Sequence, residues 1–136
     1  MNAREVMQPG VVSVSPELTL RQFEEFLTSE DISGAPVVSR GGQVIGMASK
    51  TDIVTALAEE LEDRDERLGA SRTVEDVMSR DVVTVAPATP VEDVARVMVD
   101  GHLHRVLVLE GEAILGIITP LDVLGALVPE RSDTPH

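Results

Sequence analysis

The chain of 136 residues carries a formal net charge of -13 and contains no cysteine. This length suits one compact domain or two small repeats. An acidic surface repels phosphate polymers and anionic lipid, so we expect no nucleic acid and no membrane surface among the partners. The lack of cysteine excludes disulfides, thiolate zinc sites and cysteine nucleophiles.

The N-terminal segment and the hydropathy pattern predict a cytoplasmic protein. MNAREVMQPG lacks the apolar stretch of a signal peptide, and no window is apolar for long enough to predict a membrane span. The aromatic residues are Phe23 and Phe26 alone, so the expected core is aliphatic. Stacking platforms for single-stranded nucleic acid are missing.

The first half of the chain predicts a strand, a helix, two strands and a second helix. VVSV alternates β-branched and small residues, which is typical of a short strand. The next segment places apolar residues at positions 20, 23, 26 and 27, a helical spacing. Two strands joined by a turn at Gly41 and Gly42 follow, and then a helix. The predicted ranges are 11–14, 15–30, 35–38, 43–49 and 51–66.

The second half repeats this order, which indicates an internal duplication. VMQPGVVSVSP at 6–16 aligns with VMSRDVVTVAP at 77–87, and VIGMASKTDIVTAL at 44–57 aligns with ILGIITPLDVLGAL at 114–127. One repeat of about 55 residues buries too little surface by itself. We therefore predict an α/β (α+β) fold of two tandem β–α–β–β–α repeats, packed sheet to sheet with pseudo-two-fold symmetry.

The repeats and their composition also predict the domain boundaries. Repeat 1 is expected over 1–62 and repeat 2 over 73–129, with a charged linker at 63–72 between them. In that linker Gly69 is expected to end the solvated helix. The polar residues 130–136 predict a disordered tail.

The order of the elements and their motifs resembles the CBS (cystathionine-β-synthase) domain family. The resemblance rests on EVM and EDVM, the V-x-V-x-P strand, APVVS and the closing G-h-h-S/T-x-x-D, where h is hydrophobic. It covers about residues 3–128, so the chain is similar to a stand-alone tandem CBS pair, or Bateman module. The resemblance implies an adenosyl ligand (AMP, ADP, ATP or S-adenosylmethionine) in clefts between the repeats. It also implies a homodimer formed through the helices, and regulation of a partner protein.

The closing motif places a hydroxyl and a carboxylate where a strand feeds a helix, as Ser49 with Asp52 and as Thr119 with Asp122. One interpretation is a capping box, in which the hydroxyl and the carboxylate satisfy the first amides of the helix. The other is a ligand site, because helix N-termini attract phosphate and a carboxylate accepts from ribose hydroxyls. The resemblance implies the second role at both positions. Gly46 and Gly116, earlier in the motif, would let backbone approach the site closely.

The resemblance implies further contacts for each residue that matches the family pattern. His104 and Arg105 would reach the phosphates of a ligand held by Asp52, which would leave the Asp122 cleft the weaker of the two. The alternative for this pair is a solvent-exposed strand end. Adenine contacts are expected from the first strands and a phosphate contact from one lysine, although core valines and a solvated lysine are ordinary alternatives. These residues are Val12, Ser13, Val83, Thr84 and Lys50.

The expected function is a regulatory ligand-binding module, and the alternative is a structural or protein-interaction dimer with vestigial, empty clefts. No enzyme is expected, because G-x-S-x-G, a Walker lysine and HExxH are all absent. The homodimer prediction also rests on helix stripes that one small core does not obviously need. These stripes are Phe23, Phe26 and Leu27 in repeat 1 and Val94, Val97 and Met98 in repeat 2.

No metal site and no required cofactor are expected. His102 and His104 alternate along a predicted strand and therefore share one face. A third ligand from Asp31 or Asp100 is only a guess, and tetrahedral zinc needs at least three protein ligands.

Overall fold

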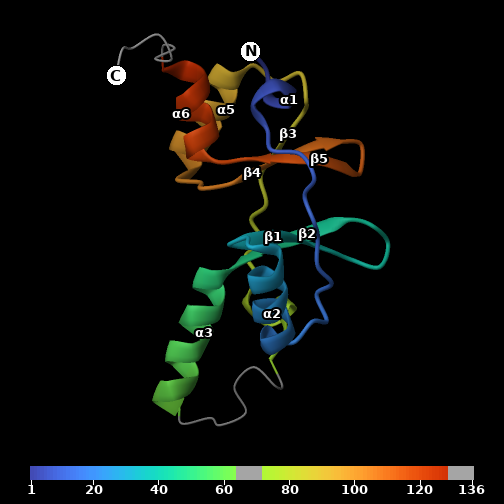
Figure 1. Ribbon diagram of the computed structural model, residues 1–136, viewed down its shortest axis with the longest axis vertical. Helices are drawn as coiled ribbons and strands as arrows, with labels where there is room; N and C mark the ends of the chain where they lie inside the picture. Colours follow the sequence, from blue (N-terminus) through green and yellow to red (C-terminus); the bar gives the residue numbers. More distant parts are fainter. Residues whose placement is uncertain (64–71, 129–136) are drawn as a thin grey trace. The chain divides into compact units, whose positions relative to one another are not determined.

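The computed structural model describes residues 1–63 and 72–128 of the chain (Figure 1). The chain forms two compact units. The repeat-1 unit comprises Val12–Val82, and the repeat-2 unit comprises Met1–Val11 together with the chain from Val83 onward. Most of the predicted linker, with Gly69, and the predicted tail at 130–136 lie outside the described residues.

In the repeat-1 unit, a hairpin packs with helices. Strands β1 (Gly34–Val38) and β2 (Val44–Ser49) pair antiparallel, with Ala35 opposite Ala48. Helix α2 (Leu20–Glu30) precedes the hairpin, α3 (Lys50–Asp63) follows it directly, and the one-turn helix α4 (Val74–Val77) comes later. The predicted strand at 11–14 is wrong in extent, because only Val14 pairs, through a single parallel bridge with Val37.

The repeat-2 unit has the same plan with one more strand. Strands β3 (Thr84–Val85), β4 (Val106–Glu110) and β5 (Ala113–Ile118) form a sheet in that order, in which β3 is parallel and β5 antiparallel to β4. Helices α5 (Val91–Gly101) and α6 (Pro120–Leu127) lie side by side, and the one-turn helix α1 (Ala3–Val6) packs against both (Figure 1).

The first segment of each repeat packs in the unit of the other repeat. Ala3 of α1 is buried in the core cluster of the repeat-2 unit, and Asn2 forms a bridge with Pro90. Val74 of α4 is likewise buried in the cluster of the repeat-1 unit. The sequence analysis missed both one-turn helices, although their capping boxes have the diagnostic three-residue spacing: Asn2 with Glu5 and Thr73 with Asp76.

The buried side chains form two clusters, each within one unit. Phe23 and Leu27 of α2 are both 0% exposed, and Val94 and Met98 of α5 are 0% and 6% exposed. The expectation that these stripes exceed what one small core needs is therefore wrong for these four residues. Each stripe instead packs onto the sheet of its own unit, as an amphipathic helix in a small α/β layer requires. Phe26 and Val97 are partly buried.

Helices α2 and α5 end at the same kind of residue. Asp31 (φ 55°) and His102 (φ 52°) are left-handed, and their N–H groups donate to carbonyls of the last turn. Strand β4 begins only at Val106, so the predicted strand through His102 and His104 is wrong. Neither position is glycine, the usual residue in this conformation, so the sequence contains no clear signal for these helix ends.

Candidate functional site

Strand β2 runs directly into helix α3 at Ser49. The backbone N–H of Ser49 donates to Asp52 Oδ2 at 2.8 Å, and the Ser49 hydroxyl donates to the same oxygen at 3.1 Å. The Asp52 N–H in turn donates to Ser49 Oγ at 3.4 Å. Both side chains are partly buried, and these hydrogen bonds form the capping box that is one of the two interpretations of the sequence.

The junction between β5 and α6 reproduces this geometry. Thr119 donates to Asp122 Oδ2 through its N–H at 2.8 Å and through its hydroxyl at 3.0 Å. The Asp122 N–H lies 3.4 Å from Thr119 Oγ1, and Pro120 occupies the first helical position, where its missing N–H costs nothing. The capping-box prediction is confirmed at this junction and at that of Ser49.

Capping boxes occur at other helices of the described chain as well. Asn2 and Glu5 cap α1, Thr19 and Gln22 cap α2, and Thr73 and Asp76 cap α4. The box by itself therefore does not identify a ligand site. What sets the junctions of Ser49 and Thr119 apart is their place between a strand and a helix of at least eight residues.

The two carboxylates differ in how much acceptor capacity they retain. Among the described residues none donates to Asp52 Oδ1, and Oδ2 accepts only from Ser49. Asp122 also receives the side-chain amide of Gln8, whose Nε2 lies 3.0 Å from Oδ1 and 3.1 Å from Oδ2. The sequence analysis missed Gln8. The repeat alignment predicts that Gln8 is equivalent to Ser79. No local pattern predicts a hydrogen bond between Gln8 and a residue 114 positions away.

In each unit, a pair of backbone hydrogen bonds joins a distant segment of the chain to the strand that leads into the junction. Gln8 exchanges N–H···O bonds of 2.8 and 3.0 Å with Ile117 on β5, and Ser79 exchanges bonds of 2.8 and 2.9 Å with Met47 on β2. Gly116 and Gly46 permit this approach. A Cβ at Gly116 would lie 2.9 Å from the Gln8 carbonyl oxygen, and one at Gly46 would lie 2.8 Å from that of Ser79. The predicted close approach therefore involves the chain's own backbone.

The remaining predicted contacts are spread over both units. In the repeat-1 unit Val12, Ser13 and Lys50 are exposed, and the Lys50 N–H donates to the Ser33 carbonyl at 2.9 Å. In the repeat-2 unit Thr84 is exposed and Val83 is partly buried. The adenine and phosphate roles of these residues stay predictions.

His104 and Arg105 lie in the loop between α5 and β4, at the junction of Thr119. Arg105 directly precedes Val106, which pairs with Ile118, the residue before Thr119. The corresponding pair in the repeat-1 unit, Gly34 with Ser49, is part of the ladder. The proposed contribution of His104 and Arg105 to a ligand at Asp52 stays a prediction.

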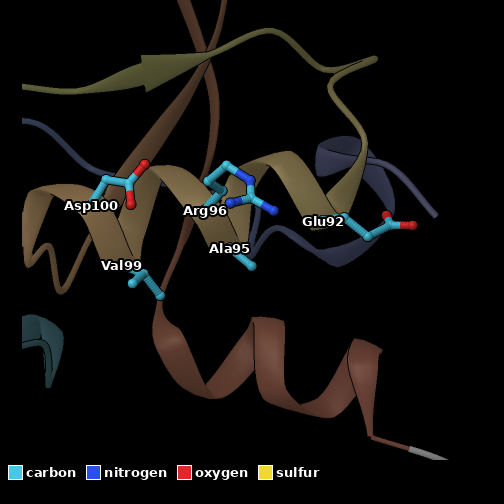
Figure 2. Close-up of a pocket in the computed structure, with 5 residues that line it drawn as sticks. All are labelled: Glu92, Ala95, Arg96, Val99 and Asp100. Carbon is cyan, nitrogen blue, oxygen red and sulfur yellow. The ribbon is translucent and has the colours of Figure 1, made fainter.

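An open depression of about 250 Å³ lies along one face of α5, where Ala95 and Val99 point towards α6 (Figure 2). Its lining contains none of the predicted ligand residues. No group of three metal-ligating side chains occurs within residues 1–63 and 72–128. In the same ranges, no helix is long and apolar enough to cross a membrane.

Comparison with known proteins matches the model of the CBS domain to residues 3–59 and again to residues 74–129. The uncharacterized protein MJ1225 of Methanocaldococcus jannaschii is 27% identical over 91% of this chain, which spans 42% of that relative. The uncharacterized protein MJ1426 of the same organism is 28% identical over 94% of this chain and 92% of its own length.

Solved structures share the fold. The CBS domain of a CBS domain-containing membrane protein from Sphaerobacter thermophilus superposes with a TM-score of 0.80 at 27% identity, covering 96% of this chain and 90% of that one. CBSX2 in complex with AMP gives 0.75 at 23% identity, covering 92% and 94%. The CBS domain pair of MJ0100 with 5′-methylthioadenosine and S-adenosyl-L-methionine gives 0.76 at 22% identity, covering 90% and 92%.

Proposed function

The chain belongs to the CBS domain family, and on that premise we propose that it is a regulatory module that binds an adenosyl compound at its strand–helix junctions. The sites proposed are Ser49–Asp52 and Thr119–Asp122. Support comes from the ligands named for two structures of the same fold, which are AMP for one and S-adenosylmethionine with 5′-methylthioadenosine for the other. The module passes its ligand state to a partner protein, and it has no catalytic role.

The main structural support for this proposal is that Asp52 has unused hydrogen-bond acceptor positions. An ionised carboxylate has about four acceptor positions. The capping box uses two of them, both on Oδ2, and none of the described residues donates to Oδ1. A vicinal diol supplies two hydroxyl donors, which matches the two positions left. The N-terminus of α3 beside it favours a phosphate electrostatically.

A thermal-shift panel tests this proposal. The compounds are AMP, ADP, ATP, S-adenosylmethionine and 5′-methylthioadenosine. For each charged compound, a simple salt that contains the same counter-ion is the control. A ligand at 100 times its dissociation constant adds about 2.7 kcal/mol to the free energy of unfolding. That corresponds to roughly 5–10 °C for a chain of this size. If no compound shifts the midpoint, the chain is instead a structural or interaction module, whose serine, threonine and aspartate side chains serve as helix caps.

We also propose a homodimer, on a different surface from the one that the sequence predicted. On α6 the side chains of Leu121, Leu124 and Leu127 are 75%, 56% and 46% exposed, and on the neighbouring α5 Val99 is 71% exposed. These four exposed apolar residues lie on two helices that pack against each other, and exposed apolar patches usually contact another protein. A second copy of the chain is the occupant that the family premise favours.

Sedimentation velocity checks the dimer with one variant and one control. Leu124→Glu places a charge among these exposed apolar residues, and we expect the sedimenting species to fall from the mass of a dimer to that of a monomer. Leu124→Met keeps the surface apolar and should sediment like the wild type. A wild-type chain that sediments as a monomer at all concentrations would contradict the proposed dimer.

A further inference from the structure

We infer that Gln8 is a specificity-determining residue, which occupies the carboxylate of Asp122 and so disfavours ligands with a vicinal diol at that junction. This inference rests on the proposed function, because it concerns one of the two proposed sites. Gln8 makes no part of the capping box. Its side chain is exposed and reaches Asp122 from the first segment of repeat 1.

Counting acceptor positions separates the two junctions. Thr119 donates twice to Asp122 Oδ2, and Gln8 Nε2 lies within hydrogen-bond distance of both carboxylate oxygens. These four contacts match the roughly four acceptor positions of a carboxylate. A ribose at Asp122 must therefore displace the Gln8 amide, whereas one at Asp52 meets two unused positions. Charge-assisted contacts of this kind are the stronger hydrogen bonds, so displacing this one has a cost.

The fold holds Gln8, which competes with a ligand for Asp122, next to the junction. The backbone of Gln8 is fixed to Ile117 by two hydrogen bonds, and Ile117 lies two residues before Thr119 on the same strand. The side chain therefore starts from a defined point next to the junction, and reaching the carboxylate costs side-chain rotamer freedom but no further ordering of the backbone.

The other unit contains the matched comparison. Ser79 has the same bridge, to Met47, and Met47 lies two residues before Ser49. Among the hydrogen bonds of the described residues, none joins the shorter Ser79 side chain to Asp52. Its Oγ instead accepts from the Asp81 N–H at 3.4 Å. The difference in acceptor use between the two carboxylates therefore follows from one side chain at one aligned position, so single substitutions can exchange it.

The experiment isolates each junction and exchanges the two side chains. In an Asp52→Ala background, which leaves the Asp122 junction, Gln8→Ser is expected to tighten AMP binding by roughly 3- to 10-fold, measured by calorimetry. In an Asp122→Ala background, Ser79→Gln is expected to weaken AMP binding by a similar factor. 2′,3′-Dideoxy-AMP lacks both hydroxyls, and its affinity should be the same with and without each exchange.

The outcomes distinguish this inference from the proposed function. If AMP binds at the Asp122 junction with the same affinity before and after the Gln8→Ser substitution, the role of Gln8 is rejected and the ligand site stands. Equal changes for AMP and for its dideoxy analogue reject the inference too, because they would reflect a contact other than the diol. If neither AMP nor any other compound of the thermal-shift panel binds to the wild-type and variant chains, the proposed function fails and the inference fails with it.

Discussion

Gly46→Ala is expected to lower the free energy of unfolding by about 1–3 kcal/mol, the usual cost of forcing an extra carbon into a packed position. The new Cβ would lie 2.6 Å from Met78 Sδ and 2.8 Å from the Ser79 carbonyl oxygen. The methionine can move aside, but the carbonyl belongs to the bridge with Met47 and cannot move without breaking it. Thermal and urea unfolding measure the loss.

Gly116→Ala repeats the test in the other unit, because its Cβ would lie 2.9 Å from the Gln8 carbonyl oxygen. The control is Gly125→Ala. Gly125 lies inside α6, where an added Cβ has no heavy atom within 4 Å, so alanine there is expected to stabilise the helix by about 0.5–1 kcal/mol. Unchanged stability in Gly46→Ala and Gly116→Ala would show that the bridges to β2 and β5 are not packed as described.

Asp52→Ala is expected to weaken adenosyl binding by roughly 10- to 100-fold. The variant removes an ionised acceptor, and hydrogen bonds to charged groups contribute about 1.5–3 kcal/mol. It also removes half of a capping box, so a loss of about 1 kcal/mol in stability accompanies the loss of affinity. Calorimetry with AMP, at a temperature where the variant is fully folded, measures the loss of affinity alone. Unfolding experiments without ligand measure the loss of stability.

Asp76→Ala is the matched control for that experiment. Asp76 Oδ2 accepts from Thr73 as Asp52 Oδ2 accepts from Ser49, through the N–H at 2.9 Å and the hydroxyl at 3.2 Å. The stability cost of its removal should therefore be similar, yet AMP affinity should be that of the wild type. Equal losses of affinity in Asp52→Ala and Asp76→Ala would mean that capping alone accounts for the effect of Asp52.

Local patterns in the sequence predicted much of the fold and part of the site. Helices α2 and α5 follow from apolar spacing, and the junctions of Ser49 and Thr119 follow from a hydroxyl and a carboxylate three residues apart. These features depend on neighbours within one or two turns, so the sequence contains the whole signal. The internal repeat also predicted that the two junctions occupy equivalent positions in their repeats.

Features that depend on distant contacts were not predictable in this way. Whether α1 packs with its own repeat or with the other depends on tertiary burial of Ala3, which carries no local signal. The left-handed endings at Asp31 and His102 lack the glycine that usually marks them. The contact of Gln8 with Asp122 needs both the bridge to Ile117 and the length of the side chain.

The central claim is that adenosyl compounds bind at the strand–helix junctions, and an NMR titration tests it most directly. The ¹⁵N-labelled chain is titrated with AMP and, separately, with S-adenosylmethionine, and backbone amide shifts are followed residue by residue. We expect saturable shifts at Lys50–Asp52 with one of the two compounds and weaker binding at Pro120–Asp122, where Leu121 and Asp122 supply the amides. Saturable shifts confined to other parts of the chain, or none with either compound, would contradict the claim.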